Sequence, residues 1–427
     1  MHSWKPEICI LFITVLVLSL TEYSKSQHFD IFRETDFLHR TINMEDDQDF
    51  FPYEDNYTHD GIFVHEFISY AFHPFWQLDW ERRLFKDNAL RMSVGSIRTD
   101  ELLVHGELSL NEDLSRGWWF NARGIWYSNL HRNHRDLSLY LGLERELFKG
   151  ISFFALCFPR FNKEDLGVQL GMAWYGRKRQ HYLNLALVLP EMVYDEKNEL
   201  GGKSSQKPLG IQWYARYQTG KFIAFSEGLL GNGFERIYPD PEKSPLQTSH
   251  DRKINQAQFK LYYQPSLTTM LQFYLYTYFF KEAKTFYEAQ NNFDYKNAIS
   301  DISLRYLFRI QEKHRIQLLS QYVMKDARSL GFREHDFDRR DLLAGLFYEY
   351  FWSDHTLELG YMLSLYDWSY NSVNDFLDAA LNNKYYDKVY IGYAFAFNEN
   401  ALVRISVSHQ PAIKGFGGGS IQYMMFF

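Results

Sequence analysis

Nine charged side chains fall at every second position of segments that alternate between apolar and polar residues. They are Arg123, Glu144, Arg216, Lys260, Arg305, Arg309, Glu349, Glu358 and Arg404. Positions i and i+2 of a strand share one face, so these charges would gather on the wet face of a sheet. If that face borders a water-filled interior, six cations against three anions favour a slight preference for anions. The alternative is that the charges pair with one another and require no ligand.

Tyrosines occupy the same faces, at Tyr274, Tyr276, Tyr278 and Tyr366. Their rings would stack on sugars in one interpretation. In the other, they pack against neighbours or form an interfacial girdle.

Catalysis would need side chains that converge on one point. Ser408 and His409 are adjacent in an alternating segment, so they point to opposite faces and cannot form a nucleophile–base pair. Four histidines lie near predicted strand ends but in no recognisable motif: His105, His181, His314 and His355. Neither GxSxG nor HExxH occurs, and phosphate loops and dinucleotide fingerprints are absent. We predict no catalytic residue and no cofactor.

A metal site is conceivable only near the N-terminus, where His59, His65 and His73 follow a cluster of carboxylates. Their spacings match no standard ligand pattern. The acidic run EDDQD at residues 45–49 lacks the glycine and the closing glutamate of a calcium loop. No metal site is predicted.

The elements that would position the nine charges are strands, because the sequence has a period of two from Ala89 onwards. Apolar residues alternate with others in four clear segments: Leu137–Leu143, Leu183–Leu189, Ile302–Ile310 and Leu357–Leu365. Many segments run for about ten residues, the length of a tilted strand that crosses a bilayer. A soluble sandwich also alternates, so the pattern alone does not decide between the two.

The links between predicted strands alternate in length. Working back from Phe427 they are 411–416, 398–399, 370–384, 353–354, 325–340, 311–313, 281–297, 264–267, 231–254, 218–219, 190–207, 176–178, 159–165, 145–149 and 128–134. Short turns on one side and longer loops on the other are typical of a membrane barrel. Links 110–116 and 98–100 break the alternation. The count is eighteen strands, with sixteen left open.

The C-terminal stretch Gly417–Phe427 alternates in the same way, with Ser420 and Gln422 on its polar face. Its apolar positions are Ile421, Tyr423, Met425 and Phe427. A final strand that alternates and ends on phenylalanine resembles the terminal strand of bacterial outer-membrane β-barrel proteins. The resemblance implies that these four side chains face lipid and that the barrel-assembly machinery reads this strand.

Composition agrees with a barrel and excludes other classes. Aromatic residues make up 18% of the 427 residues, which favours interfacial girdles. The net charge of −7 argues against a nucleic-acid partner, which would require a basic face. The two cysteines are Cys9 and Cys157, and one of them lies in the predicted leader, so no internal disulfide is expected.

Three regions are predicted along the chain. Residues 1–26 form a signal peptide, with Lys5 before an apolar run and cleavage before Gln27; an uncleaved anchor is the alternative. Residues 27–88 form an acidic extension, periplasmic or plug-like, whose Phe75–Phe85 segment places Trp76, Trp80 and Leu84 on one helical face. Residues 89–427 form the barrel.

The expected fold is therefore all-β, a transmembrane antiparallel barrel of about sixteen to eighteen strands in a bacterial outer membrane. Its size and polar face predict a porin-like channel for small hydrophilic solutes or an exported polymer. The alternative is a sealed barrel that acts as a surface receptor, adhesin or outer-membrane hydrolase. A soluble secreted sandwich or propeller is the structural rival. Whether the barrel is a monomer or a trimer is left open.

Overall fold

The fold of the chain is that of a computed structural model. The structure describes residues 88–96, 103–129, 134–159, 165–176, 181–194, 203–206, 209–238, 247–287, 292–311, 313–331, 335–372, 385–411 and 415–427. The predicted leader and the predicted extension, apart from Asn88, lie outside the described residues. So do the histidines considered above for a metal site.

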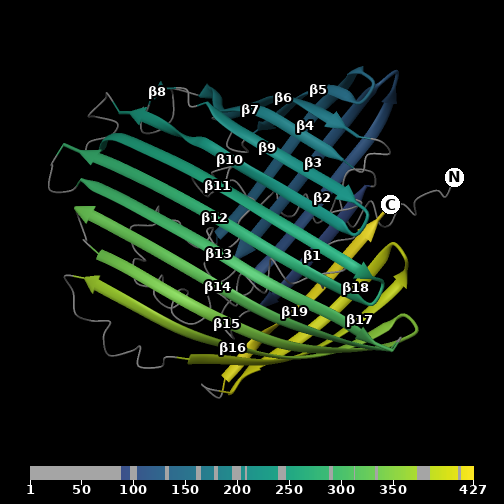
Figure 1. Cartoon of the computed structure of the whole chain (residues 1–427). Coiled ribbons are helices and arrows are strands. Elements are labelled where there is room, and N and C mark those ends of the chain that lie inside the picture. The colour runs from purple at the N-terminus through teal and green to yellow at the C-terminus, as the bar shows by residue number, and fades with distance from the viewer. Residues whose placement is uncertain are drawn as a thin grey trace. The chain divides into compact units, whose positions relative to one another are not determined.

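The described residues form one antiparallel sheet of nineteen strands that closes on itself (Figure 1). The first ten are β1 Ala89–Ser96, β2 Leu103–Ser115, β3 Trp118–Asn129, β4 His134–Phe148, β5 Ile151–Pro159, β6 Asp165–Tyr175, β7 Tyr182–Tyr194, β8 Lys203–Gln206, β9 Gly210–Thr219 and β10 Phe222–Ile237. The others are β11 Gln247–Ser266, β12 Thr269–Phe286, β13 Phe293–Ile310, β14 His314–Gly331, β15 His335–Trp352, β16 His355–Ser372, β17 Tyr385–Asn398, β18 Ala401–Gln410 and β19 Gly415–Phe426.

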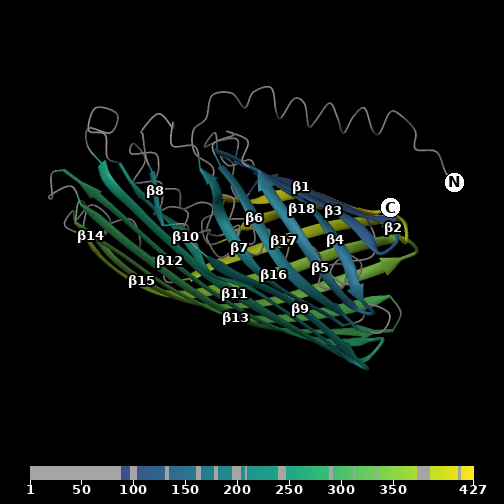
Figure 2. The ribbon, with the colours of Figure 1, turned by 90° about the horizontal axis from the view of Figure 1, so that it is seen from above.

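Eighteen of these strands make the ring, because β7 pairs directly with β9 and the short β8 pairs only with the end of β10. Strand β1 pairs with both β2 and β19, and this seam closes the barrel. The blue N-terminal strands and the yellow C-terminal strands meet there (Figure 1; Figure 2). The predicted all-β barrel of sixteen to eighteen antiparallel strands is confirmed. Within the described residues, no helix is long and apolar enough to span a membrane.

Tight turns gather at one end of the barrel, here named the turn end. The turn of β9–β10 uses Gly220 and that of β4–β5 uses Gly150, both with positive φ, which glycine adopts without strain. Asn88 and Phe427 lie at the same end, since the Phe427 N–H donates to the Asn88 carbonyl at 2.9 Å. The opposite end, the loop end, carries the connections that follow β1, β3, β5 and each alternate strand of the ring. The barrel therefore has the predicted alternation, with short links at the turn end and longer links at the loop end.

Several predicted links are wrong in extent. Link 110–116 is mostly strand, since β2 continues to Ser115 and the turn is formed by Arg116 and Gly117. The alternation therefore does not break at the first hairpin. At the loop end, the strands extend into the predicted links 231–254, 281–297 and 325–340. Polar residues on both faces of these strand ends resemble a loop in sequence, but cross-strand partners still hold them in the ladder.

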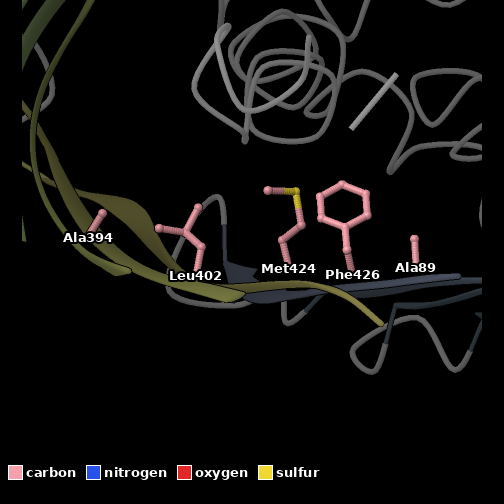
Figure 3. Close-up of a cluster of buried hydrophobic side chains, with 5 residues drawn as sticks. All are labelled: Ala89, Ala394, Leu402, Met424 and Phe426. Carbon is pink, nitrogen blue, oxygen red and sulfur yellow. The ribbon is translucent and has the colours of Figure 1, made fainter. Parts of the chain in front are cut away.

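The register assigns every strand position to one of two faces, and the faces differ in exposure. On the outer face, aliphatic side chains such as Leu185 and Ile421 are each 56% exposed. On the concave inner face, Ala89, Ala394, Leu402, Met424 and Phe426 are buried against one another across the seam (Figure 3). We name this group the seam cluster. The outer face is therefore open and apolar, as lipid contact requires.

The inner face is not uniformly polar, which differs from the prediction. Besides the seam cluster it carries three buried apolar clusters. The β10–β13 cluster is Ile223, Phe225, Tyr262, Met270 and Leu307; the β14–β16 cluster is Leu319, Leu343, Phe347 and Met362; the β5–β7 cluster is Phe154, Ala173, Tyr182 and Ala186. In the sequence these residues stand between polar inner-face neighbours, so alternation hides them.

Candidate functional site: the inner face of the barrel

All nine predicted charges lie on the inner face by register. Cross-strand partners share a face, and the chain of partners Glu349, Glu358, Gly392 and Ser406 leads around the wall to the inner side of the seam. Five of the nine are almost fully buried: Glu144, Arg216, Arg305, Glu349 and Glu358. Arg404 is buried as well, whereas Arg309 is exposed. The structure thus gathers the nine on one surface but not at one point.

The strongest contact on this surface joins Arg404 of β18 to Glu358 of β16. The Arg404 Nε donates to both carboxylate oxygens at 2.9 and 3.0 Å, and its Nη2 lies 2.5 Å from Oε2. Arg404 Nη1 also donates to Gln422 at 3.2 Å, and the Tyr390 hydroxyl donates to Glu358 at 3.5 Å. A buried guanidinium and carboxylate in fork geometry satisfy each other's hydrogen-bonding groups.

A second buried pair lies beside the first. Glu349 of β15 is directly opposite Glu358, and like charges at this spacing repel. Arg315 of β14 compensates, because its Nε donates to Glu349 at 2.6 Å and its Nη2 contacts the same oxygen. The guanidinium of Arg315 also lies 4.5 Å from the ring centre of Phe351. Each carboxylate of the facing pair therefore has its own arginine.

A third ion cluster lies across the seam. Glu107 of β2 is nearly fully buried between two arginines. Arg91 Nη2 is 2.6 Å from one of its oxygens, and Arg123 Nε donates to the other at 2.9 Å. Arg123 is thus an ion-pair partner as well as an inner-face cation, as the alternative interpretation of the charges proposed.

Four more of the predicted charges have contacts with amides or aromatic rings. Arg216 donates to Gln218 at 3.2 Å and lies 5.9 Å from the ring centre of Phe225. Glu144 accepts from the Asn121 amide at 3.5 Å. Lys260 Nζ is 6.0 Å from the ring centre of Tyr274. Arg309 lies 5.4 Å from Phe351.

Amides and tyrosines form a strip on the inner face of β11–β14. Tyr274 and Tyr276 are buried and stacked, with ring centres 6.5 Å apart and planes at 5°. Beside them, the Gln321 amide donates to Asp301 at 2.9 Å. The Tyr274 hydroxyl donates to Gln258 at 3.5 Å. The tyrosines pack into the wall here, and the side chain of Tyr366 lies outside the described part of the chain.

Sequence reasoning missed Arg91, Glu107, Asp301 and Arg315. Glu107 and Arg91 belong to the first hairpin, whose boundaries were wrong. Arg315 lies on β14, where the alternation is misleading. On this strand the apolar Leu319 faces inward and the polar Ser320 faces outward. The signal that would have identified Arg315 is its position directly opposite Glu349 once β14 and β15 are paired.

The outer face carries an aromatic band at the turn end, and histidines belong to it. His314 Nδ1 lies 2.7 Å from the Tyr348 hydroxyl, and His355 Nδ1 lies 2.6 Å from that of Tyr393. His181 stacks on Tyr217 at 4.7 Å between ring centres. Aromatic and amphipathic rings at this position are typical of a membrane–water interface.

Strand β19 places its residues as the alternation predicts. Ile421 and Phe427 are exposed on the outer face, Tyr423 and Met425 are half-buried beside them, and Ser420 and Gln422 are buried inside. On β18, Ser408 faces inward and donates to the Gly418 carbonyl at 3.1 Å, while His409 is exposed. Among the described residues, no group of three or more His, Cys, Asp or Glu side chains is arranged to hold a metal ion.

No family model matches the sequence, and no curated protein matches it. Similar solved structures include OccAB3 of Acinetobacter baumannii, with 10% identity, a TM-score of 0.40, and coverage of 80% of this chain and 98% of that one. OpdK of Pseudomonas aeruginosa, solved with vanillate, has 10% identity, a TM-score of 0.38, and coverage of 80% and 97%. A loop-deletion mutant of OmpT, an outer membrane protein of Vibrio cholerae, has the same four values as OpdK.

Proposed function

We propose that the protein is a channel of a bacterial outer membrane, through which small hydrophilic solutes or an exported polymer pass. The observation that carries the proposal is the contrast between the two faces of one closed eighteen-stranded ring. The outer face is exposed and aliphatic, while the inner face holds the buried ion pairs and the amide strip. Barrels of about this size enclose a lumen wider than the wall side chains fill.

The turn end would face the periplasm. Short periplasmic turns and longer outside connections are the rule in outer-membrane barrels, and the aromatic band lies at the turn end. Asn88, where the first strand of the barrel begins, would then lie on the periplasmic side, the side to which a leader delivers an exported chain. Lipid and the barrel-assembly machinery are the partners that this placement requires. The outward residues of β19 and the C-terminus would serve as the assembly signal: Ile421, Tyr423, Met425 and Phe427.

The inner wall favours small anions over cations. Six of the nine predicted charges are cations, Lys260, Arg305 and Arg309 among them, and three are carboxylates, and all nine lie on the inner face. This excess of cations would act on a passing solute, since a ring of charge selects ions of the opposite sign.

The experiment is conductance in planar bilayers, using refolded protein whose barrel is verified by altered gel mobility on boiling. We expect stepwise currents, and a reversal potential under a potassium chloride gradient that is shifted towards chloride. Folded protein that gives no current removes the channel. Current with a potassium preference would retain the channel and remove the assignment of Lys260, Arg305 and Arg309 to its selectivity.

A further inference from the structure

We propose that four cations on the outer face of β11–β14 bind the phosphate groups of a phosphorylated glycolipid, lipid A, in the outer leaflet of the membrane. They form one line across the four strands and are named the cation row: Lys253, Lys281, Lys296 and Arg328. The inference goes beyond the proposed function. It rests on that function only for the orientation in which the loop end lies outside the cell.

The register places the four side chains of the cation row directly opposite one another. Lys253 of β11 pairs with Lys281 of β12. Lys281 pairs in turn with Lys296 of β13, and Lys296 with Arg328 of β14. These strands follow one another in the sheet (Figure 1). Because like charges directly opposite each other destabilise a sheet, the row is unfavourable for folding unless an anion lies over it.

The cation row lies on the outer face of the barrel. Lys296 is separated from Ile302 and Leu304 by an even number of positions along β13, so the three side chains share a face. Ile302 and Leu304 are outer-face residues, 39% and 46% exposed. Three members of the row are exposed and Lys281 is half-buried. The row is therefore accessible to molecules that surround the barrel.

The described part of the chain supplies no salt bridge to any member of the cation row. Asp251, Asp294 and Asp326 each lie two positions from a member of the row, on the same face, but none of them pairs with it. The outer face of β15 differs, since Arg340 is 2.8 Å from Asp338 and 3.1 Å from Asp326. An outer-face cation can thus find a carboxylate on this sheet, but the row requires an anion from outside the chain.

The depth of the cation row matches the boundary of a bilayer. Phe308 of β13 is level with Tyr348 of the aromatic band, through Ile316 between them. Lys296 lies twelve positions from Phe308, which is about 30 Å along the membrane normal for a strand tilted by about 40°. The hydrocarbon core of a bilayer has this thickness. With the aromatic band at one surface, the row therefore lies among the head groups of the other.

The chemistry of the cation row fits a head group with more than one phosphate. Neighbouring strands are about 4.8 Å apart, so the row of four spans about 14 Å. Lysine ammonium groups attract phosphate as point charges, and the guanidinium of Arg328 can hold one through two parallel hydrogen bonds. Lipid A carries a phosphate at each end of its disaccharide, and it forms the outer leaflet of a bacterial outer membrane. It is the ligand to which we assign the row.

The test measures binding of lipid A to the refolded protein in detergent by native mass spectrometry. The row variant replaces all four cations: Lys253→Gln, Lys281→Gln, Lys296→Gln and Arg328→Gln. We expect its dissociation constant for lipid A to be at least tenfold higher than that of the parent protein. The variant should fold as well as the parent, because the change removes charges that repel one another. Equal dissociation constants for the two proteins would overturn the assignment.

The matched control removes the same charge from the turn end. Its substitutions again replace three lysines and one arginine, all exposed: Arg116→Gln, Lys149→Gln, Lys221→Gln and Lys313→Gln. This protein should bind lipid A as tightly as the parent. If it loses as much affinity as the row variant, binding follows the net charge of the protein and the cation row is not the site.

The choice of ligand separates lipid A from other anions. Dephosphorylated lipid A should bind weakly, and to the same extent in the parent and the row variant. Neither phosphatidylglycerol nor inorganic phosphate should displace lipid A at equal concentration. Tight binding of dephosphorylated lipid A would show that the phosphates are not recognised. Displacement by phosphatidylglycerol would show that the row binds any anionic head group, and each result would overturn the assignment to lipid A.

Bilayer recording separates this inference from the channel. If the parent protein binds lipid A through the cation row but carries no current, the lipid site stands and the channel fails. If the parent conducts and the row variant binds lipid A as tightly as the parent does, the channel stands and the lipid site fails.

Discussion

Arg404 of β18 and Glu358 of β16 form an ion pair that passes over the intervening strand β17. The pair can form because the β17 residues beneath it are Gly392 and Ala394, which leave space above the backbone. A Cβ atom added to Gly392 would stand 2.8 Å from Glu358 Oε2. The small residues of one strand therefore determine the contact between its two neighbours.

Replacing Arg404 by methionine should destabilise the folded barrel by about 3–5 kcal/mol, since it leaves a buried carboxylate without its counter-charge. The double variant Arg404→Met with Glu358→Gln should recover much of this loss, because the uncompensated charge is gone. The check is urea unfolding in detergent, followed by the heat-modifiable gel band. If the free energy of unfolding lost in the double variant equals the sum of the losses in Arg404→Met and Glu358→Gln, the two side chains are not coupled.

Gly392→Val should break the same pair without removing either charge. Valine at this position would occupy the space of the Glu358 carboxylate, whose oxygen must then move away from Arg404. The loss should approach that of Arg404→Met and should largely vanish in an Arg404→Met, Glu358→Gln background. Gly124→Val is the matched control, because nothing lies within 4 Å of a Cβ placed there.

The architecture was predictable because two signals act over the whole chain. Side-chain alternation identifies strands with an exposed aliphatic face, as in Ile302–Ile310, and the alternating link lengths give their direction. The turn Ser353-Asp354 is local and was identified correctly, whereas the predicted turn Thr219-Gly220 lies one residue later, at Gly220-Lys221. These features depend only on nearest neighbours in sequence.

What failed depends on pairing between strands. Leu307 lies between Arg305 and Arg309 in sequence, and only the ladder places it against Met270 in a buried cluster. Likewise, Arg315 acquires its role from Glu349, thirty-four positions away. The face on which a side chain lies can be predicted from the sequence of its own strand. Predicting an ion pair also requires the register between two strands.

Leu304→Arg should lower stability in phospholipid bilayers by about 2–4 kcal/mol, the cost of an arginine on the lipid-facing side near the membrane centre. Leu304 is on the outer face in the middle of β13 and is 46% exposed. Glu399→Arg, in a turn, should cost almost nothing. Refolding into vesicles in graded urea measures both; equal effects would show that the outer face does not meet lipid.

Lys260→Glu with Arg309→Glu should move the reversal potential towards potassium, because the double variant replaces two inner-face cations with anions. The matched control is Lys221→Glu, which changes the same charge in the exposed β9–β10 turn. Bilayer recordings under a salt gradient check the result. An unchanged potential in the double variant would mean that these side chains do not border the conducting path.

Deleting Phe427 should reduce the amount of protein that reaches the outer membrane more than it changes the current of each inserted molecule. The deletion removes two things: the bond from the Phe427 N–H to the Asn88 carbonyl, and an outward ring that is 39% exposed. Phe427→Ala separates them, since it keeps the backbone bond and removes only the ring. If the assembly machinery reads the side chain, Phe427→Ala should impair insertion as much as the deletion does, whereas refolding of both purified proteins into detergent should show a defect only in the deletion. Normal membrane levels of Phe427→Ala would mean that the residue acts through closure of the seam and not through recognition.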